Sequence, residues 1–276
     1  TSAMLGLITT IPDSHKQNAP QLSSIITVIG FGLGPFIGGL IAQFSTQPLI
    51  TPYLPIIAAA ILCFFGLFLV KVPQFKAQPF SIAPRLEIPA AQHQALFFIA
   101  GLTAFSAFGA FSLFASLSPS FVKDLIPWHG PLVSGSAIAS ILLVSAVVQF
   151  SAKHLPTAKI LSLGLMTLVV SFVLLGICMS MQWSILFFIS DIMVGVGHGL
   201  GLLGAFGLIH QMTTTDNRAA VMSTYLFIGY LGTIVPIIAV GYLADHFGLT
   251  IGVVGFCVGL GLLCLSLIFW HKKISP

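Results

Sequence analysis

Hydrophobic residues fill this chain in long continuous runs that short polar breaks separate. A helix needs roughly 20 mostly apolar residues to cross about 30 Å of hydrocarbon. Eight runs fit this requirement: residues 22–44, 52–70, 95–118, 131–152, 160–181, 184–209, 219–243 and 250–270. The runs are continuously apolar and do not alternate in segments of about ten residues, so the pattern predicts membrane-spanning helices and not strands.

The composition agrees with a chain that lies almost wholly in a bilayer. Hydrophobic residues make up 57% of it and charged residues 6%, and the mean hydropathy is +1.08, so it cannot build a normal water-facing surface. The four cysteines, all inside predicted spans, have neither disulfide nor zinc spacing. We therefore expect them to be packing residues and expect no metal and no cofactor.

Basic residues indicate the orientation, because loops beside spanning helices are rich in Lys and Arg on the cytoplasmic side. Threading the eight runs alternately places one set on a single side: Lys16, Lys71, Lys76, Arg85, Lys153, Lys159, Arg218, Lys272 and Lys273. Only Lys123 falls on the other side. We predict a multi-pass protein of the plasma (inner) membrane with a cytoplasmic C-terminus. The net charge of +4 then reflects topology, and we expect no nucleic-acid partner.

The two ends of the chain resemble each other. A shift of 202 positions places Gly30 on Gly232, Gly39 on Gly241 and Lys71 on Lys273, so the first two runs match the last two. Internal repeats of this kind are common in transporters. At the same offset, residues 1–11 fall on the end of the sixth run. This predicts a six-span repeat unit, with four further helices before Thr1.

The first run carries the segment GFGLGPFIGG at residues 30–39. Its residues Gly30, Gly34, Pro35, Gly38 and Gly39 resemble the GxxxGPxxGG motif of the fifth helix of major facilitator superfamily transporters, especially drug and proton antiporters. The three glycines spaced by four lie on one helical face. We expect that face to pack backbone to backbone at the interface between two halves of the protein, with a kink at the proline.

The resemblance implies a fold and a division of the chain. The fold is an all-α membrane protein with eight transmembrane helices, the C-terminal two-thirds of a twelve-helix fold with six-helix half-repeats. Residues 1–70 would hold the end of helix four with helices five and six, 71–94 the cytoplasmic linker, and 95–276 the C-terminal half. Arg218 is similar to the Arg that the family commonly has between helices ten and eleven.

Two ionisable residues inside the sixth run are candidates for chemistry. Asp191 is the only acid in any run, and His198 follows seven residues later on the same face, with Gly195 between them. A charge at membrane depth costs about 2.5 to 3.5 kcal/mol on insertion scales, which favours a neutral acid or a water-lined site. The two side chains can pass on a proton or hold a cationic substrate. A structural pair hydrogen-bonded to another helix is the alternative.

Other residues have two interpretations each. Gln149, Tyr225 and Tyr230 are candidate cavity residues or ordinary interhelical hydrogen-bonding groups. The aromatic run of residues 95–118 suits a drug-like substrate or lipid contact; it contains Phe97, Phe98, Phe105, Phe108, Phe111 and Phe114.

The sixth run also contains Gly199, Gly201 and Gly204, which match GxGxxG. They lie inside an apolar run and not at a strand-to-helix turn, so we reject dinucleotide binding. Spacings of four, as in Gly195 with Gly199 and Gly197 with Gly201, predict close helix packing instead.

The function that the resemblance implies is secondary active transport. The chain would carry out proton-coupled efflux of small amphipathic molecules by alternating access, as in multidrug resistance, with the substrate, protons, the lipid bilayer and the preceding helices as partners. A non-transporting truncated fragment is one alternative. A membrane-embedded enzyme is another, but a single intramembrane acid and one deep histidine supply too few groups for it, so we expect no enzyme.

Overall fold

A computed structural model describes the chain over residues 19–69, 86–125, 130–214 and 217–274. The elements are α3 Ala19–Phe44, α4 Tyr53–Leu67, the short 3-10 helix η1 Ala91–His93, α5 Gln94–Leu125, α6 Pro131–Ala152, α7 Thr157–Met181, α8 Ser184–Met212, α9 Arg218–Phe247 and α10 Leu249–Ile274. The eight α-helices follow the eight apolar runs in order, which confirms the prediction of an all-α membrane protein.

Not every run forms a full-length span. In the described part of the chain, six helices, α5 to α10, are long and apolar enough to cross a membrane. Helix α4 has 15 residues, which at 1.5 Å per residue covers about 22 Å and falls short of the hydrocarbon thickness. The run 52–70 therefore gives a shorter described helix than the sequence predicts. Residues 1–18 and 71–85, which include the predicted end of helix four and most of the predicted linker, lie outside the described residues.

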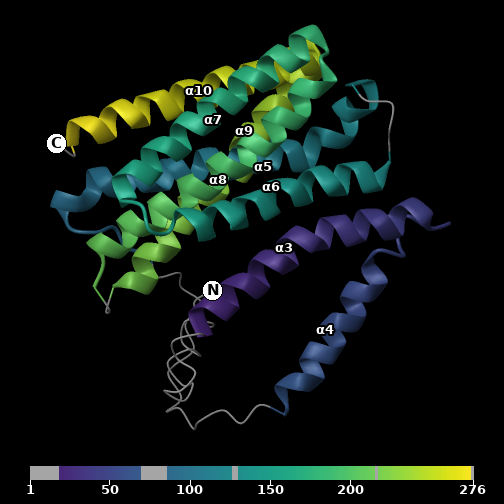
Figure 1. Ribbon diagram of the computed structural model, residues 1–276, viewed down its shortest axis with the longest axis horizontal. Helices are drawn as coiled ribbons and strands as arrows, with labels where there is room; N and C mark the ends of the chain where they lie inside the picture. The colour runs from purple at the N-terminus through teal and green to yellow at the C-terminus, as the bar shows by residue number, and fades with distance from the viewer. Residues whose placement is uncertain (1–18, 70–85, 126–129, 215–216, 275–276) are drawn as a thin grey trace.

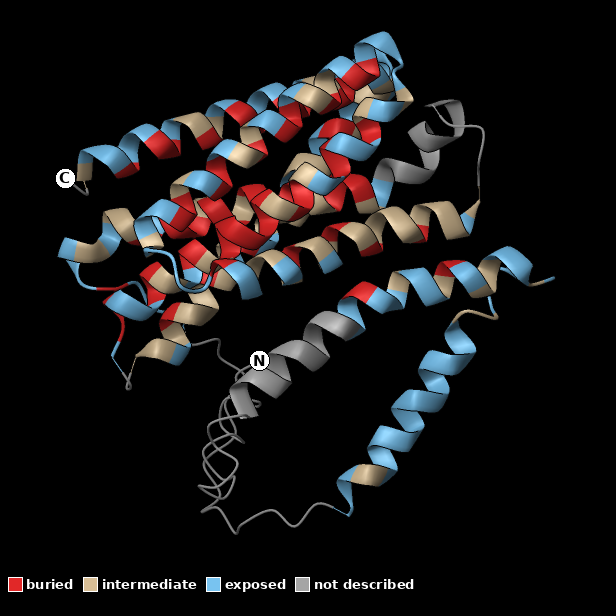
Figure 2. Ribbon diagram, in the orientation of Figure 1, coloured by how far each residue is buried: buried red, intermediate tan, exposed pale blue. Residues whose placement is uncertain are grey.

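Helices α5 to α10 form one bundle, with α3 running along α6 and α4 standing apart (Figure 1). Within the bundle α8 packs against α5, α6 and α7, and α5 packs against both α8 and α9. Helix α10 closes the bundle against α7 and α9. Buried residues concentrate on α5, α7, α8 and α10, whereas α4 has no buried residue (Figure 2). The centre of the structure is thus built around α5 and α8.

The aromatic run on α5 belongs to this centre. Phe97 and Phe114 are fully buried, and Phe105, Phe108 and Phe111 pack against the core at partial exposure. The lipid-contact interpretation is therefore wrong for Phe97 and Phe114, whereas Phe98 is exposed. Hydropathy alone does not separate a lipid-facing phenylalanine from one that packs against another helix, because both surroundings are apolar.

Three described residues have left-handed backbone, namely Gly130, Gln182 and Gly248, and two of them end a helix. Gln182 ends α7 with φ 54°, and Gly248 ends α9 with φ 92°. The N–H of Gly248 donates to the carbonyl oxygen of Ala244 at 2.9 Å, and α10 begins at the next residue. Glycine adopts this conformation without a steric penalty, so α9 and α10 can be joined by a single residue.

The segment before α5 is attached to the start of α9. The Thr224 hydroxyl accepts a hydrogen bond from the Glu87 N–H at 2.8 Å and lies 2.8 Å from the Glu87 carbonyl oxygen, to which it can donate. Both main-chain groups of Glu87 thus contact one side chain of α9. The chain is bound to the bundle well before residue 95, where the sequence predicts the C-terminal half to begin.

Candidate functional site

Asp191 lies on α8 facing α6 and is 3% exposed. The Ser140 hydroxyl of α6, which is also 2.7 Å from the carbonyl oxygen of Ala137, donates to Asp191 Oδ2. The second carboxyl oxygen, Oδ1, is buried and has no hydrogen-bond partner among the described residues. A buried carboxyl oxygen left without a donor is costly and is uncommon in folded proteins.

A cavity of about 590 Å³ adjoins Asp191 between α6 and α8. Its lining is almost wholly apolar, with Ser136 and Ser140 as the other polar side chains. The lining residues are Leu132, Val133, Ser136, Ala137 and Ser140 from α6 and Phe187, Phe188, Asp191 and Ile192 from α8. An apolar cavity with a few convergent polar groups is the usual form of a small-molecule site.

His198 has its own partner on α6. Its Nδ1 lies 2.9 Å from the Ser145 hydroxyl oxygen, which also accepts a hydrogen bond from Gln149 Nε2 at 3.1 Å. If the Ser145 hydroxyl accepts from Gln149 and donates to Nδ1, the neutral ring carries its hydrogen on Nε2. This Nε2 is buried and has no hydrogen-bond partner in the described part of the chain.

Glycines on α8 explain why the serines reach their partners. A Cβ added at Gly195 would lie 2.9 Å from the Ile141 carbonyl oxygen of α6, and one at Gly199 would lie 2.6 Å from that of Ser145. Both positions therefore require glycine for α6 to approach this closely. On another face, a Cβ at Gly197 would meet Leu168 of α7 at 2.8 Å. The predicted role of these glycines in close helix packing is confirmed.

Asp191 and His198 are not bonded to each other; each is bonded to a different serine of α6. In this respect the structure matches the interpretation of helix-to-helix hydrogen bonding. Both residues nevertheless keep one buried, unpartnered polar atom. The serines were missed at the sequence level. The available signal was that Ser140 and Ser145 occur in the same order along α6 as Asp191 and His198 along α8.

The remaining candidates fall into two places. Tyr230 stacks on Phe108 with ring centroids 5.5 Å apart, and the Phe108 ring is 5.8 Å from that of His198. Tyr230 and Gln149 thus lie next to His198, Tyr230 through Phe108 and Gln149 through Ser145. We call these five residues the His198 cluster. Tyr225 lies elsewhere: its ring is 5.3 Å from Phe206, and its buried hydroxyl has no partner among the described residues.

The glycine motif on α3 packs against α6, but not through the predicted face. Gly30, Gly34 and Gly38 would each meet nothing within 4 Å if a Cβ were added. A Cβ at Gly39 would instead overlap the carbonyl oxygen of Pro131 of α6, and one at Gly135 of α6 would overlap that of Pro35.

The expectation that the face with spacing four makes this contact is therefore wrong. Gly32 and Gly39, spaced by seven, are the buried pair, and a Cβ at Gly32 would meet the Leu143 side chain at 3.0 Å. A helical spacing of four identifies a flat face but not which face has a partner.

Arg218 begins α9, with its N–H donating to the Thr214 carbonyl oxygen at 3.1 Å. Its Nε lies 3.5 Å from the Thr213 hydroxyl, at the long limit for a hydrogen bond. The side chain thus lies at the end of the α8–α9 connection.

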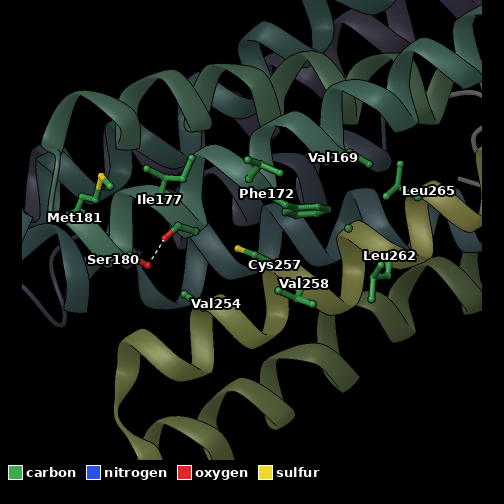
Figure 3. A pocket seen from close by; sticks show the side chains of 13 residues that line it. Val169, Phe172, Ile177, Ser180, Met181, Val254, Cys257, Val258, Leu262 and Leu265 are labelled. Atoms are coloured by element: carbon green, nitrogen blue, oxygen red, sulfur yellow. Dashed lines mark hydrogen bonds between the residues drawn. The ribbon is translucent and has the colours of Figure 1, made fainter.

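A second cavity, of about 420 Å³, lies between α7 and α10 (Figure 3). Phe172, Val173, Ile177 and Leu262 contribute to its apolar wall. Ser180 is the polar side chain, and its hydroxyl donates to the carbonyl oxygen of Gly176 at 2.9 Å. Unlike the Asp191 cavity, this groove presents no ionisable oxygen. Over the described residues, no three His, Cys, Asp or Glu side chains lie close enough together to hold a metal ion.

Replacing Ser145 by alanine is expected to destabilise the protein by about 1 to 3 kcal/mol, because both His198 Nδ1 and Gln149 Nε2 lose their partner in a buried site. Unfolding by increasing SDS in mixed micelles measures the change. Ser151→Ala is the matched control on α6, since that exposed hydroxyl bonds only to the Val147 carbonyl oxygen of its own helix. Equal stability of the two variants would contradict a stabilising role for the Ser145 network.

Comparison with known proteins adds one match. Residues 3–235 match the sequence model of the Major Facilitator Superfamily, which covers most of the chain. A comparison with curated proteins gives no significant match.

Proposed function

The chain belongs to the major facilitator superfamily of membrane transporters, and we propose that it works as a secondary active transporter that exports small amphipathic molecules in exchange for protons. Transport proceeds by alternating access, with the C-terminus on the cytoplasmic side of the plasma (inner) membrane. The lipid bilayer and a small-molecule substrate follow from the family. Proton coupling, outward direction, alternating access, the kind of membrane and the cytoplasmic C-terminus are the proposed parts.

One observation carries the proposal. Asp191 and His198 lie on the same membrane-spanning helix, both almost wholly buried, and each has an unpartnered polar atom. Ionisable groups at membrane depth are expensive and are characteristic of substrate and proton pathways. Buried polar groups that serve only structure are usually hydrogen-bonded, and Asp191 Oδ1 and His198 Nε2 have no partner among the described residues.

The internal repeat supports the proposed division into residues 1–70, a linker 71–94 and a C-terminal half 95–276. Gly39 of α3 packs on α6, whereas its counterpart Gly241 of α9 has open space. Conversely, Gly232 of α9 packs on Phe105 of α5, whereas its counterpart Gly30 has open space. The packed position of α3 therefore corresponds to an open position of α9, and the packed position of α9 corresponds to an open position of α3. This is the pattern expected if each half-repeat fills one face internally and offers the other to a helix of the opposite half.

Asp191→Asn is expected to abolish proton-driven transport and to leave membrane insertion intact, because asparagine keeps the shape and the bond to Ser140 but exchanges no proton. The measurement is accumulation of a labelled amphipathic substrate in proteoliposomes under an imposed pH gradient. Asp245→Asn is the matched control, since Asp245 is an exposed acid at the end of α9.

Three outcomes would count against the proposal. Normal coupling in Asp191→Asn would remove this residue from the mechanism. Recovery of a chemically altered product would favour a membrane-embedded enzyme. Well-folded protein that moves no substrate under any gradient would favour a non-transporting fragment.

A further inference from the structure

The cavity between α6 and α8 has one strong acceptor and a large apolar wall. Asp191 Oδ1 is unpartnered, and Asp191 lines the 590 Å³ cavity directly. The other polar side chains there are already engaged. The Ser136 hydroxyl donates to the Leu132 carbonyl oxygen at 2.7 Å, and Ser140 bonds to Asp191 Oδ2. A ligand that completes this site must therefore supply a donor to a single carboxyl oxygen.

An inorganic cation fits this site poorly. Ca²⁺ takes six to eight oxygen ligands and Mg²⁺ an octahedron of oxygens. The lining residues contain at most four side-chain oxygens, two from Asp191 and two from the serines, and the other lining side chains are hydrocarbon, including Leu132, Val133 and Phe187. Its volume also exceeds that of a bare ion many times. An organic cation with an apolar body satisfies both the acceptor and the walls.

The mouth of the cavity is apolar as well. Phe188 and Ile192 line the cavity and are themselves partly exposed, and they continue an exposed stripe on α8 that includes Ile185 and Ile189. The four positions recur at helical spacing on one face of α8. The mouth of the cavity is therefore lined by hydrocarbon, which suits a ligand with an apolar body.

We propose that this pocket binds lipophilic amines, with the ammonium N–H donating to Asp191 Oδ1 and the apolar body lying between α6 and α8. Phe188, which lines the cavity, supplies an aromatic ring with which the cation can interact. The inference rests on the proposed function, because it names the chemical class of substrate. The site lies nearer the start of α8 than His198 and is separate from the His198 cluster.

Binding can be measured without a gradient. Detergent-solubilised protein is dialysed against labelled 4-phenylbutylamine, with uptake by protein-free micelles subtracted, and 4-phenylbutanol serves as the uncharged analogue. We expect saturable binding of the amine and at least about tenfold weaker binding of the alcohol. Asp191→Asn should weaken amine binding by at least about tenfold, and Asp245→Asn should leave it unchanged.

A second pair of variants tests the place of the site without altering the acid. Ile192→Trp adds bulk at the mouth and should weaken amine binding, whereas Ile189→Trp should not. Both isoleucines are 44% exposed on α8, but only Ile192 lines the cavity. Elution as a single species in size-exclusion chromatography verifies folding of each variant.

The inference is overturned if the alcohol binds as tightly as the amine, or if well-folded Asp191→Asn or Ile192→Trp binds the amine like the wild type. These results are separable from failure of the proposed function. Asp191-dependent binding without any gradient-driven transport would defeat the transport proposal and leave the binding site standing. Proton-driven transport by the wild type, together with unchanged amine binding in Asp191→Asn, would defeat the binding site and leave the transport proposal standing.

Discussion

Replacing Gly39 by leucine is expected to reduce transport more than about tenfold, while the α5–α10 bundle still folds. A Cβ at this position would overlap the Pro131 carbonyl oxygen at the start of α6, and Gly135 faces it with the same restriction toward Pro35. Neither backbone can yield, so the two helices must separate. Overpacking of this kind costs about 1 to 3 kcal/mol, which is enough to displace one helix from another.

The effect is measured as the initial rate of gradient-driven uptake at matched protein levels. Gly34→Leu is the control on the same helix, because a Cβ there would meet nothing within 4 Å. A spin-label or fluorescent pair on α3 and α6 reports the separation directly. Unchanged distance and transport in Gly39→Leu would show that the contact is not required.

Replacing Gly164 by leucine should prevent the bundle from folding. A Cβ at Gly164 of α7 would overlap the Gly201 nitrogen of α8 and lie 2.9 Å from the Gly201 Cα and from the Leu200 carbonyl carbon. Gly204 contacts α7 with comparable tightness, since a Cβ there would lie 2.8 Å from the Leu161 backbone. Because α8 lies at the centre of the bundle, forcing α7 away from it should cost about 3 kcal/mol or more.

The measurement is the yield of monodisperse protein after extraction from the membrane. Gly176→Leu is the matched control on the same helix, because a Cβ there would meet nothing within 4 Å. We expect little or no folded protein from Gly164→Leu and near-normal yield from Gly176→Leu. If both variants fold equally well, the α7–α8 contact is looser than the backbone distances require.

The order and type of the helices could be predicted because a membrane imposes one strong condition. Each span must be apolar and must satisfy its own backbone hydrogen bonds, so hydropathy alone locates it. The eight runs accordingly became eight helices. Glycine spacing was informative in the same way on α8, where Gly195 and Gly199 allow the close approach of a neighbouring helix as predicted, and that helix is α6.

Which helix faces which was much less predictable. Gly30, Gly34 and Gly38 formed the more regular series, yet Gly39 makes the contact with α6. Phe97 and Phe114 of α5 are fully buried among other helices. In each case the sequence within one helix is compatible with lipid or protein on either face. The choice depends on a partner elsewhere in the chain.

The candidate site shows the same limit. Asp191 and His198 stood out because ionisable residues are rare in apolar runs. Ser140 and Ser145 did not, because serines are common in membrane helices and usually bond to their own backbone, as Ser151 does. Only the close approach of α6 to α8 selects these two serines. Their role is a product of the packing and has no local signature.

The bond between Thr224 and Glu87 bears on how motion would pass from one half to the other. In the proposed division, Glu87 belongs to the linker, and its two hydrogen bonds attach the linker to α9 before α5 begins. A displacement of the linker would therefore act on the start of α9 as well as on α5. Helix α9 also packs closely against α5 at Gly232. Force from the other half would thus reach α5 and α9 together, and we expect these two helices to move as a pair.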